Sequence, residues 1–197
     1  MAESRKARER KPPRPVTAAS LENAAVYYLS RFASSSGNLR RVLMRKVARG
    51  ARNAEDGQAE AGAQMVEALI ARYLDKGLLN DRAYAAQAAS SLARRGASRY
   101  SIAGKLAQKG VESELVTQTI ADLNEEGEAT ELAAACALVR RRRMGAYRTP
   151  EKRADFRDKD LASLARAGFR LDLARRVLRA KDIEALERQA RGGADDD

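Results

Sequence analysis

The chain has 197 residues, 44% of them hydrophobic and only 5% aromatic, with a formal net charge of +11. The excess of Lys and Arg predicts attraction to a polyanion or to an acidic protein surface. Histidine is absent and no apolar run approaches the roughly 18 residues of a membrane span, which excludes Ser-His-Asp catalysis, His-ligated metal sites and a membrane-spanning protein.

The chain starts with a basic, Pro-containing stretch, residues 1–17, that we expect to be a flexible arm. This stretch has no apolar core of the kind found in a secretory signal, so we expect a cytoplasmic protein. Apolar residues at helical spacing follow it, beginning at Leu21, and Ser20 is the expected N-cap of this first helix.

The next two predicted helices complete a unit over residues 18–77. The serine cluster at 34–36 ends the first helix and caps the second, which runs to Gly50. The polar stretch at about 51–63 is expected to be a loop insertion, and a third helix follows it. One unit is therefore three short helices.

Nearly the same pattern returns 63 positions later, in a predicted second unit over residues 78–125, with Asn80 or Asp81 as the expected cap of its first helix. Self-similarity at a fixed period indicates that a small unit was copied and stacked. The two segments match at paired positions: Arg31 and Arg94, Ser35 and Ser98, Leu39 and Ile102, Leu43 and Leu106, Lys46 and Lys109.

A third, diverged unit is predicted over residues 126–191, because Leu164 and Gly168 align with Leu106 and Gly110 after a shift of 58 positions. Its first helix is expected at 130–144, a long connection at 145–160, and a last helix that continues through Ile183 and Leu186. An acidic tail, 192–197, follows. Since each unit holds too few apolar residues for an independent core, we predict an all-α, elongated array of three tandem three-helix repeats.

Several residues of types that often act in catalysis or binding are better explained here by packing or by their spacing. Cys136 lies in an apolar run and is expected to be a buried small residue. Gly96 and Gly104 are too far apart for a phosphate-cradling loop. Tyrosines 28, 84 and 100 are at helical positions where packing is expected rather than stacking on bases. We therefore expect no catalytic residue, no cofactor and no bound metal.

Basic residues are the candidate binding groups, because Arg and Lys hold phosphates or acidic side chains without reading sequence. Residues 140–143 are four consecutive arginines at a predicted helix end, where one or two would complement the helix dipole. Four neighbours at about 100° each cannot all face one partner. The candidate contacts are Arg31, Arg40, Arg41, Arg45, Lys46, Arg94, Arg95, Lys105, Lys109, Arg140, Arg141, Arg142 and Arg143.

Three segments resemble the RecX regulatory proteins of bacteria: LENAAVYYLSRFASSSGNLRRVLMRKV, GLLNDRAYAAQAASSLARRGASRYSIAGKLAQKGV and LARAGFRLDLARRVL. The resemblance covers most of residues 20–180 and implies tandem three-helix repeats. It also implies a non-enzymatic regulator that acts as a monomer. Such proteins bind RecA recombinase filaments on single-stranded DNA, directly or through RecA, and mainly inhibit the ATPase, recombinase and co-protease activities of RecA.

The alternative is a general DNA-binding helical repeat protein that has no RecA partner. The segment from Ser98 to Gly110 has a helix-turn-helix character, although it lacks a clear set of base-reading side chains. Under the RecX interpretation, alanine at Arg40, Arg41 and Arg45 together is expected to weaken filament inhibition and to leave helix content unchanged.

Overall fold

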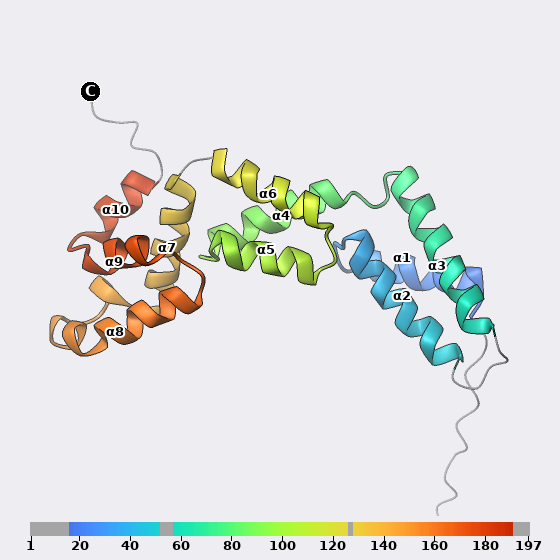
Figure 1. Ribbon diagram of the computed structural model, residues 1–197, viewed down its shortest axis with the longest axis horizontal. Helices are drawn as coiled ribbons and strands as arrows, with labels where there is room; N and C mark the ends of the chain where they lie inside the picture. Colours follow the sequence, from blue (N-terminus) through green and yellow to red (C-terminus); the bar gives the residue numbers. More distant parts are fainter. Residues whose placement is uncertain (1–15, 52–56, 126–127, 191–197) are drawn as a thin grey trace, which may run out of the picture. The chain divides into compact units, whose positions relative to one another are not determined.

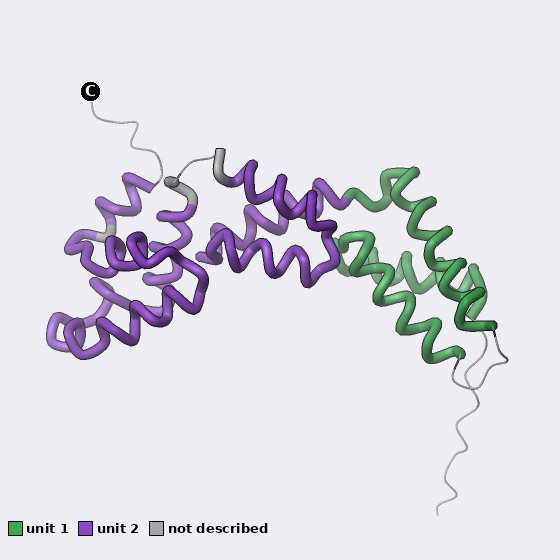
Figure 2. Tube along the Cα trace, in the orientation of Figure 1, with its two compact units in different colours: residues 1–80 green, residues 81–197 purple. Residues whose placement is uncertain are grey.

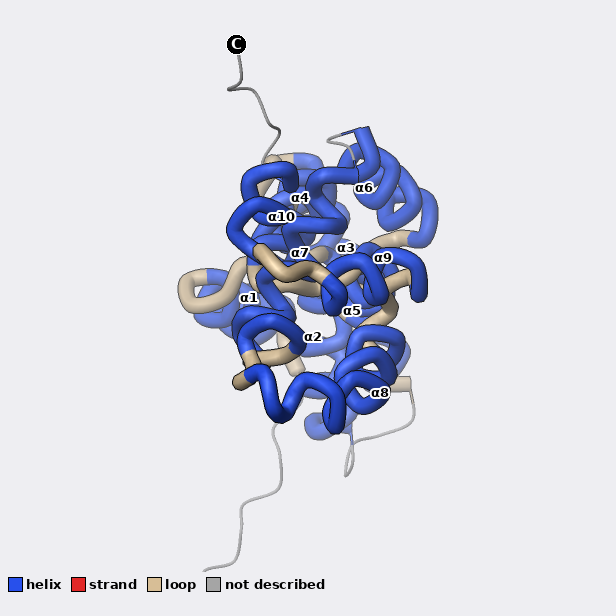
Figure 3. The backbone as a smooth tube through the Cα atoms, turned by 90° about the vertical axis from the view of Figure 1, so that its left-hand side faces the viewer, coloured by secondary structure: helices blue, strands red, loops and turns tan. Residues whose placement is uncertain are grey.

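The computed structural model describes residues 16–51, 57–125 and 128–190, and in these ranges it contains helices and loops but no strand (Figures 1 and 3). The predicted all-α class is confirmed. The chain divides into two compact units, residues 1–80 and residues 81–197 (Figure 2). Across the described ranges, no helix is both long and apolar enough to cross a membrane.

The first unit contains α1 (Ala18–Leu29), α2 (Ser36–Gly50) and α3 (Gln58–Asp75). Thr17, rather than Ser20, is the N-cap of α1, so the predicted cap was wrong. The two residues form a capping box, in which each side chain accepts a hydrogen bond from the other's backbone N–H at 3.1–3.2 Å. Val16 packs against the core, so the last two residues of the predicted arm belong to the fold. Residues 1–15 lie outside the described ranges.

The core of the first unit is built from residues on all three helices, together with Leu79 after them. The helix α3 begins at Gln58, inside the stretch predicted as a loop at 51–63, and residues 52–56 lie outside the described ranges. Gly62, in the first turns of α3, packs so closely on Val47 that an added Cβ would come within 2.6 Å of it. The buried side chains are Leu21, Ala25, Leu39, Leu43, Val47, Val66, Leu69, Ile70 and Tyr73.

The second unit begins with α4 (Asp81–Arg94), α5 (Arg99–Gln108) and α6 (Ser113–Glu125), which surround their own cluster of apolar residues. Residues at paired positions of the repeat have the same structural role in both units. Ser35 and Ser98 are both N-caps, and each hydroxyl accepts from a backbone N–H three residues later at 3.1 Å. Leu39, Leu43, Ile102 and Leu106 are all buried, as the repeat predicted.

The rest of the second unit contains α7 (Glu128–Arg142), a 3-10 turn η2 (Gly145–Tyr147), α8 (Pro150–Arg166), α9 (Leu171–Arg179) and α10 (Ile183–Ala190). The predicted connection at 145–160 is mostly helix, because Pro150 starts α8, where its missing N–H has no cost. The predicted last helix is two helices, since the chain turns at Ala180 and α10 packs on α7. Residues 192–197 lie outside the described ranges.

The two halves of the second unit are joined by close backbone contacts. Gly96, with a φ of +81°, lies directly against α7 at Ala134 and Leu138. The Ser98 hydroxyl donates to the carbonyl of Ala167 at 2.6 Å. Each half still has its own apolar cluster. The contacts between the halves make residues 81–190 part of one compact unit. The boundary between a second and a third repeat therefore stays a prediction.

Cys136 is fully buried in the last cluster, as predicted. Burial, with a smaller contribution from the Glu187 carboxylate, raises the pKa of its thiol to about 11. We expect the native protein to react with a thiol reagent at pH 8 at least about 100-fold more slowly than the unfolded chain, because both the thiolate fraction and access fall. Labelling followed by mass spectrometry checks this, and equal rates in the native and denaturant-unfolded protein would contradict it.

Candidate functional site

The candidate cations differ in what their side chains already contact. On α2, Arg40 forms a two-pronged ion pair with Glu67 of α3, with N–O distances of 2.7 and 2.9 Å. Arg31, which follows α1, stacks over the ring of Tyr27 at 4.4 Å. The fold already engages both guanidinium groups, so they are weaker candidates for a partner than the sequence suggested.

The solvent-exposed face of α2 carries Arg41 and Arg45, each two positions after a core leucine. Two positions turn a helix by about 200°, which places these arginines opposite the core. Sequence reasoning missed Arg49, which continues this exposed face and donates to the carbonyl of Arg45 at 3.3 Å. Its spacing of four from Arg45 was the signal that would have found it. Lys46 is half-buried beside this face.

The arginine run at the end of α7 is divided among different partners. Arg140 pairs with Glu187 of α10 at 3.3 Å, and Arg141 donates to the Arg95 carbonyl at 2.6 Å. Arg142 donates to the Ser163 hydroxyl at 2.8 Å. Three of these arginines therefore tie α7 to other elements, as the angular spread of the run requires. Arg143 follows in the left-handed region, with a φ of +51°, and is exposed.

The second repeat contributes Arg94, Arg95, Lys105 and Lys109, all of them exposed. Arg94 donates to the Ser90 hydroxyl at 2.7 Å on its own helix. Five candidate side chains have no side-chain partner among the described residues, and these are the cations most open to a new contact: Arg45, Lys46, Arg95, Lys105 and Arg143.

The aromatic candidates separate in the same way. Tyr28 and Tyr84 are partly buried against their clusters, as predicted, and the Tyr28 hydroxyl accepts from Asn38 at 2.9 Å. Tyr100 is 80% exposed, so the prediction that it packs was wrong. Its ring lies beside Gly168, where an added Cβ would come within 2.9 Å of the ring.

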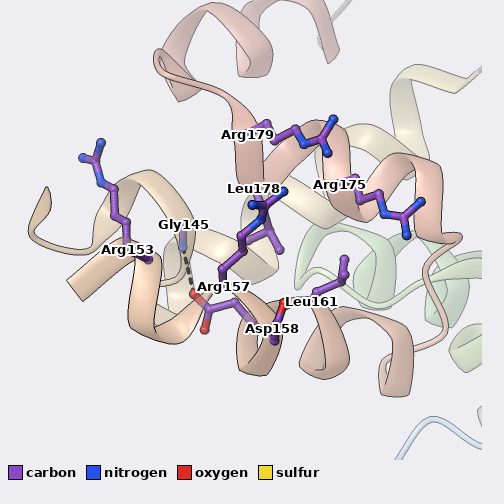
Figure 4. Close-up of a pocket in the computed structure, with 10 residues that line it drawn as sticks. Gly145, Arg153, Arg157, Asp158, Leu161, Arg175, Leu178 and Arg179 are labelled. Carbon is purple, nitrogen blue, oxygen red and sulfur yellow. Dashed lines mark hydrogen bonds between the residues drawn. The ribbon is translucent and has the colours of Figure 1, made fainter. Parts of the chain in front are cut away.

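A basic pocket between α8 and α9 was not predicted at all (Figure 4). One wall is fixed by Asp160, which accepts from Arg148 at 2.7 and 2.9 Å and from the Gly145 N–H at 3.1 Å. Burial alone would raise the pKa of Asp160, but these hydrogen bonds outweigh burial and hold the pKa below its ordinary value. Four arginines line the pocket, namely Arg153, Arg157, Arg175 and Arg179.

The candidate cations and the pocket between α8 and α9 therefore offer positive charge and hydrogen-bond donors. Among the residues that the structure describes, no group of three His, Cys, Asp or Glu side chains is arranged to hold a metal ion. Guanidinium and ammonium groups of this kind bind phosphate or carboxylate oxygens by charge-assisted hydrogen bonds.

Comparison with known proteins places this chain in a family. Residues 80–120, which span α4, α5 and most of α6, match a family model described as the second three-helix domain of RecX. The protein named Regulatory protein RecX from Myxococcus xanthus (strain DK1622) is 44% identical over 179 residues, which cover 89% of this chain and 93% of the relative. The chain belongs to the RecX family.

A second RecX relative, named Regulatory protein RecX and found in Agrobacterium fabrum (strain C58 / ATCC 33970), is 32% identical over 164 residues, 83% of this chain and 84% of the relative. No solved structure matches this RecX-family protein. The matched RecX domain includes Arg94, Arg95, Lys105 and Lys109. The α7 arginines and the pocket between α8 and α9 lie outside it.

Proposed function

We propose that this RecX-family protein binds RecA filaments on single-stranded DNA in the cytoplasm and mainly inhibits the ATPase, recombinase and co-protease activities of RecA. The observation that carries the proposal is the near full-length likeness to a protein named as a RecX regulator. Exposed cations on helices in both units support it, because they suit an acidic protein surface or DNA phosphates. The protein acts by binding and needs no catalytic residue of its own.

The direct test adds the purified protein to RecA on single-stranded DNA and measures DNA-dependent ATP hydrolysis and strand exchange. Both rates are expected to fall as this protein approaches the amount of RecA. No effect on either rate at a stoichiometric excess would overturn the proposal.

The cations that have no side-chain partner in the described structure suggest a variant that tests the proposed inhibition of RecA. Alanine at Arg45 and Lys46 removes two charges that form no hydrogen bond or ion pair with a side chain in the described structure, and should raise the concentration for half-inhibition by at least about five-fold. This pair is a sharper test than the triple variant with Arg40, whose loss would also break the pair with Glu67. The control carries alanine at Lys76 and Arg82, two exposed cations that are not candidates. Equal effects of both variants would show that net charge alone matters.

A general DNA-binding protein without a RecA partner is the second candidate, and the formal net charge of +11 favours it. A salt titration separates the two functions. Tight binding to bare DNA that falls steeply with salt supports general binding. Weak binding that becomes tight only when RecA coats the strand supports the RecA regulator.

A further inference from the structure

The pocket between α8 and α9 is a cavity of about 450 Å³ within the second unit. That volume lies in the range of roughly 300–1,000 Å³ that small-ligand sites occupy. Residues of α8 and α9 line the pocket, together with Gly145 of η2 (Figure 4). Ala154, Leu161 and Leu178 provide its apolar lining, and every residue that lines it belongs to residues 145–179.

The lining carries more positive charge than the fold uses. Four arginines and two aspartates line the cavity. Arg153 donates to the carbonyls of Ala146 and Arg148 at 2.9 and 3.1 Å. The charge of Asp160 is balanced by Arg148. The groups left without a side-chain partner in the described structure are Arg157, Arg175 and Arg179, together with Asp158.

Two of these three guanidinium groups are like charges on neighbouring turns of one helix. Arg175 and Arg179 are four positions apart on α9, where like charges destabilise a helix by some tenths of a kcal/mol. Arg157 extends from α8 toward α9 in the view of the pocket (Figure 4). An anion between the helices would relieve this repulsion and accept hydrogen bonds from both sides.

We propose that this pocket binds a phosphate group, carried either by a nucleic-acid strand or by a free nucleotide. The planar fork of an arginine matches two oxygens of a phosphate at once. The wall held by the Asp160, Arg148 and Gly145 hydrogen bonds keeps the backbone of the pocket in place without a ligand. This inference goes beyond the proposed function and does not depend on it, because the phosphate site needs no RecA.

The test uses the full chain and two probes, a short fluorescent oligothymidylate and ATP, each in the absence of RecA. Glutamine at Arg157, Arg175 and Arg179 is expected to weaken binding of the probe that uses the pocket by at least about ten-fold. For the oligothymidylate, loss of each phosphate contact should also lower the steepness of the log–log salt dependence by about 0.7. The charge-matched control carries glutamine at Arg166, Lys181 and Arg188, exposed cations of the same repeat that do not line the pocket.

For a second pair of variants we expect tighter phosphate binding, a result that misfolding cannot produce. Asn at Asp158 removes a carboxylate from the pocket and is expected to tighten phosphate binding by about two- to five-fold. Asn at Asp155, an exposed position on the same helix outside the pocket, should change it less than half as much.

The two probes distinguish the source of the phosphate. Loss of oligothymidylate binding with no measurable ATP binding identifies a nucleic-acid strand, and loss of stoichiometric ATP binding identifies a nucleotide. The proposal is overturned if neither probe binds the full chain. It is also overturned if the pocket variant and its charge-matched control weaken binding equally, since that result assigns the effect to overall charge.

Discussion

Alanine at Gly96 is expected to destabilise the second unit by about 3–4 kcal/mol. The φ of +81° at this position costs an L-residue roughly 1–2 kcal/mol. The added Cβ would also lie 2.7 Å from the Leu138 nitrogen and 2.9 Å from the Ala134 oxygen. These are backbone atoms of α7 and cannot rotate away, so the overpacking adds a further 1–3 kcal/mol or so.

Two other glycines separate these contributions. Gly77 has a φ of +69° with nothing within 4 Å of an added Cβ, so alanine there should show the backbone cost alone. Gly104 lies within α5 with open space around it, and alanine there should stabilise the protein by up to about 1 kcal/mol. Urea unfolding followed by circular dichroism ranks the three variants. Equal effects at Gly96 and Gly77 would mean that the contact with α7 carries no energy.

Asparagine at Asp160 is expected to destabilise the segment from η2 to α9 by about 2–3 kcal/mol at pH 7. Removing one partner of a buried ion pair costs about 3–5 kcal/mol, and the lower value here follows from the partial exposure of Arg148. The change also places an amide nitrogen near donors that now meet a carboxylate. Hydrogen exchange of peptides from α8 and α9 should speed up in the variant, whereas asparagine at the exposed Asp155 should leave exchange unchanged.

The same carboxylate predicts a pH dependence of stability. The pKa of Asp160 is lower in the folded protein than in the unfolded chain, where it is about 3.9. Its contribution is therefore present in full above the unfolded pKa and is lost as the pH falls through the folded pKa. We expect the difference in stability between the wild type and the asparagine variant to be constant from pH 7 to about pH 5 and to shrink below about pH 4. A constant difference down to pH 3 would contradict this assignment.

Local patterns made much of the fold predictable. The paired positions identified the N-caps Ser35 and Ser98 and the buried leucines, because a cap needs one side chain close in sequence and a helix buries residues at a fixed spacing. The errors occurred where the local signals compete or are weak. Thr17 and Ser20 are both able to cap, and only the extended backbone of Thr17, directly before the helix begins at Ala18, shows which one does. The charged start of α8 has no apolar period, so the sequence predicts a connection where the structure has a helix.

The candidate binding groups were harder to predict, because charge is visible in the sequence and partners are not. Arg40 and Arg45 look alike in sequence, yet among the residues that the structure describes only Arg40 meets a carboxylate, 27 positions away on α3. The α7 arginines look like one basic patch, yet three of them hold elements of the second unit together. The arginines of the α8 and α9 pocket were missed, because two separate helices bring them together.

The sequence by itself determined the helical class, the repeated unit with its caps and core positions, and, through its likeness to RecX proteins, the family. These properties depend on neighbours a few positions apart or on whole-chain similarity. Only the tertiary structure decided which cations the fold already uses and which remain open to a partner. Whether a cation has a partner depends on distances between residues that are far apart in the chain, and local sequence spacing does not predict these distances.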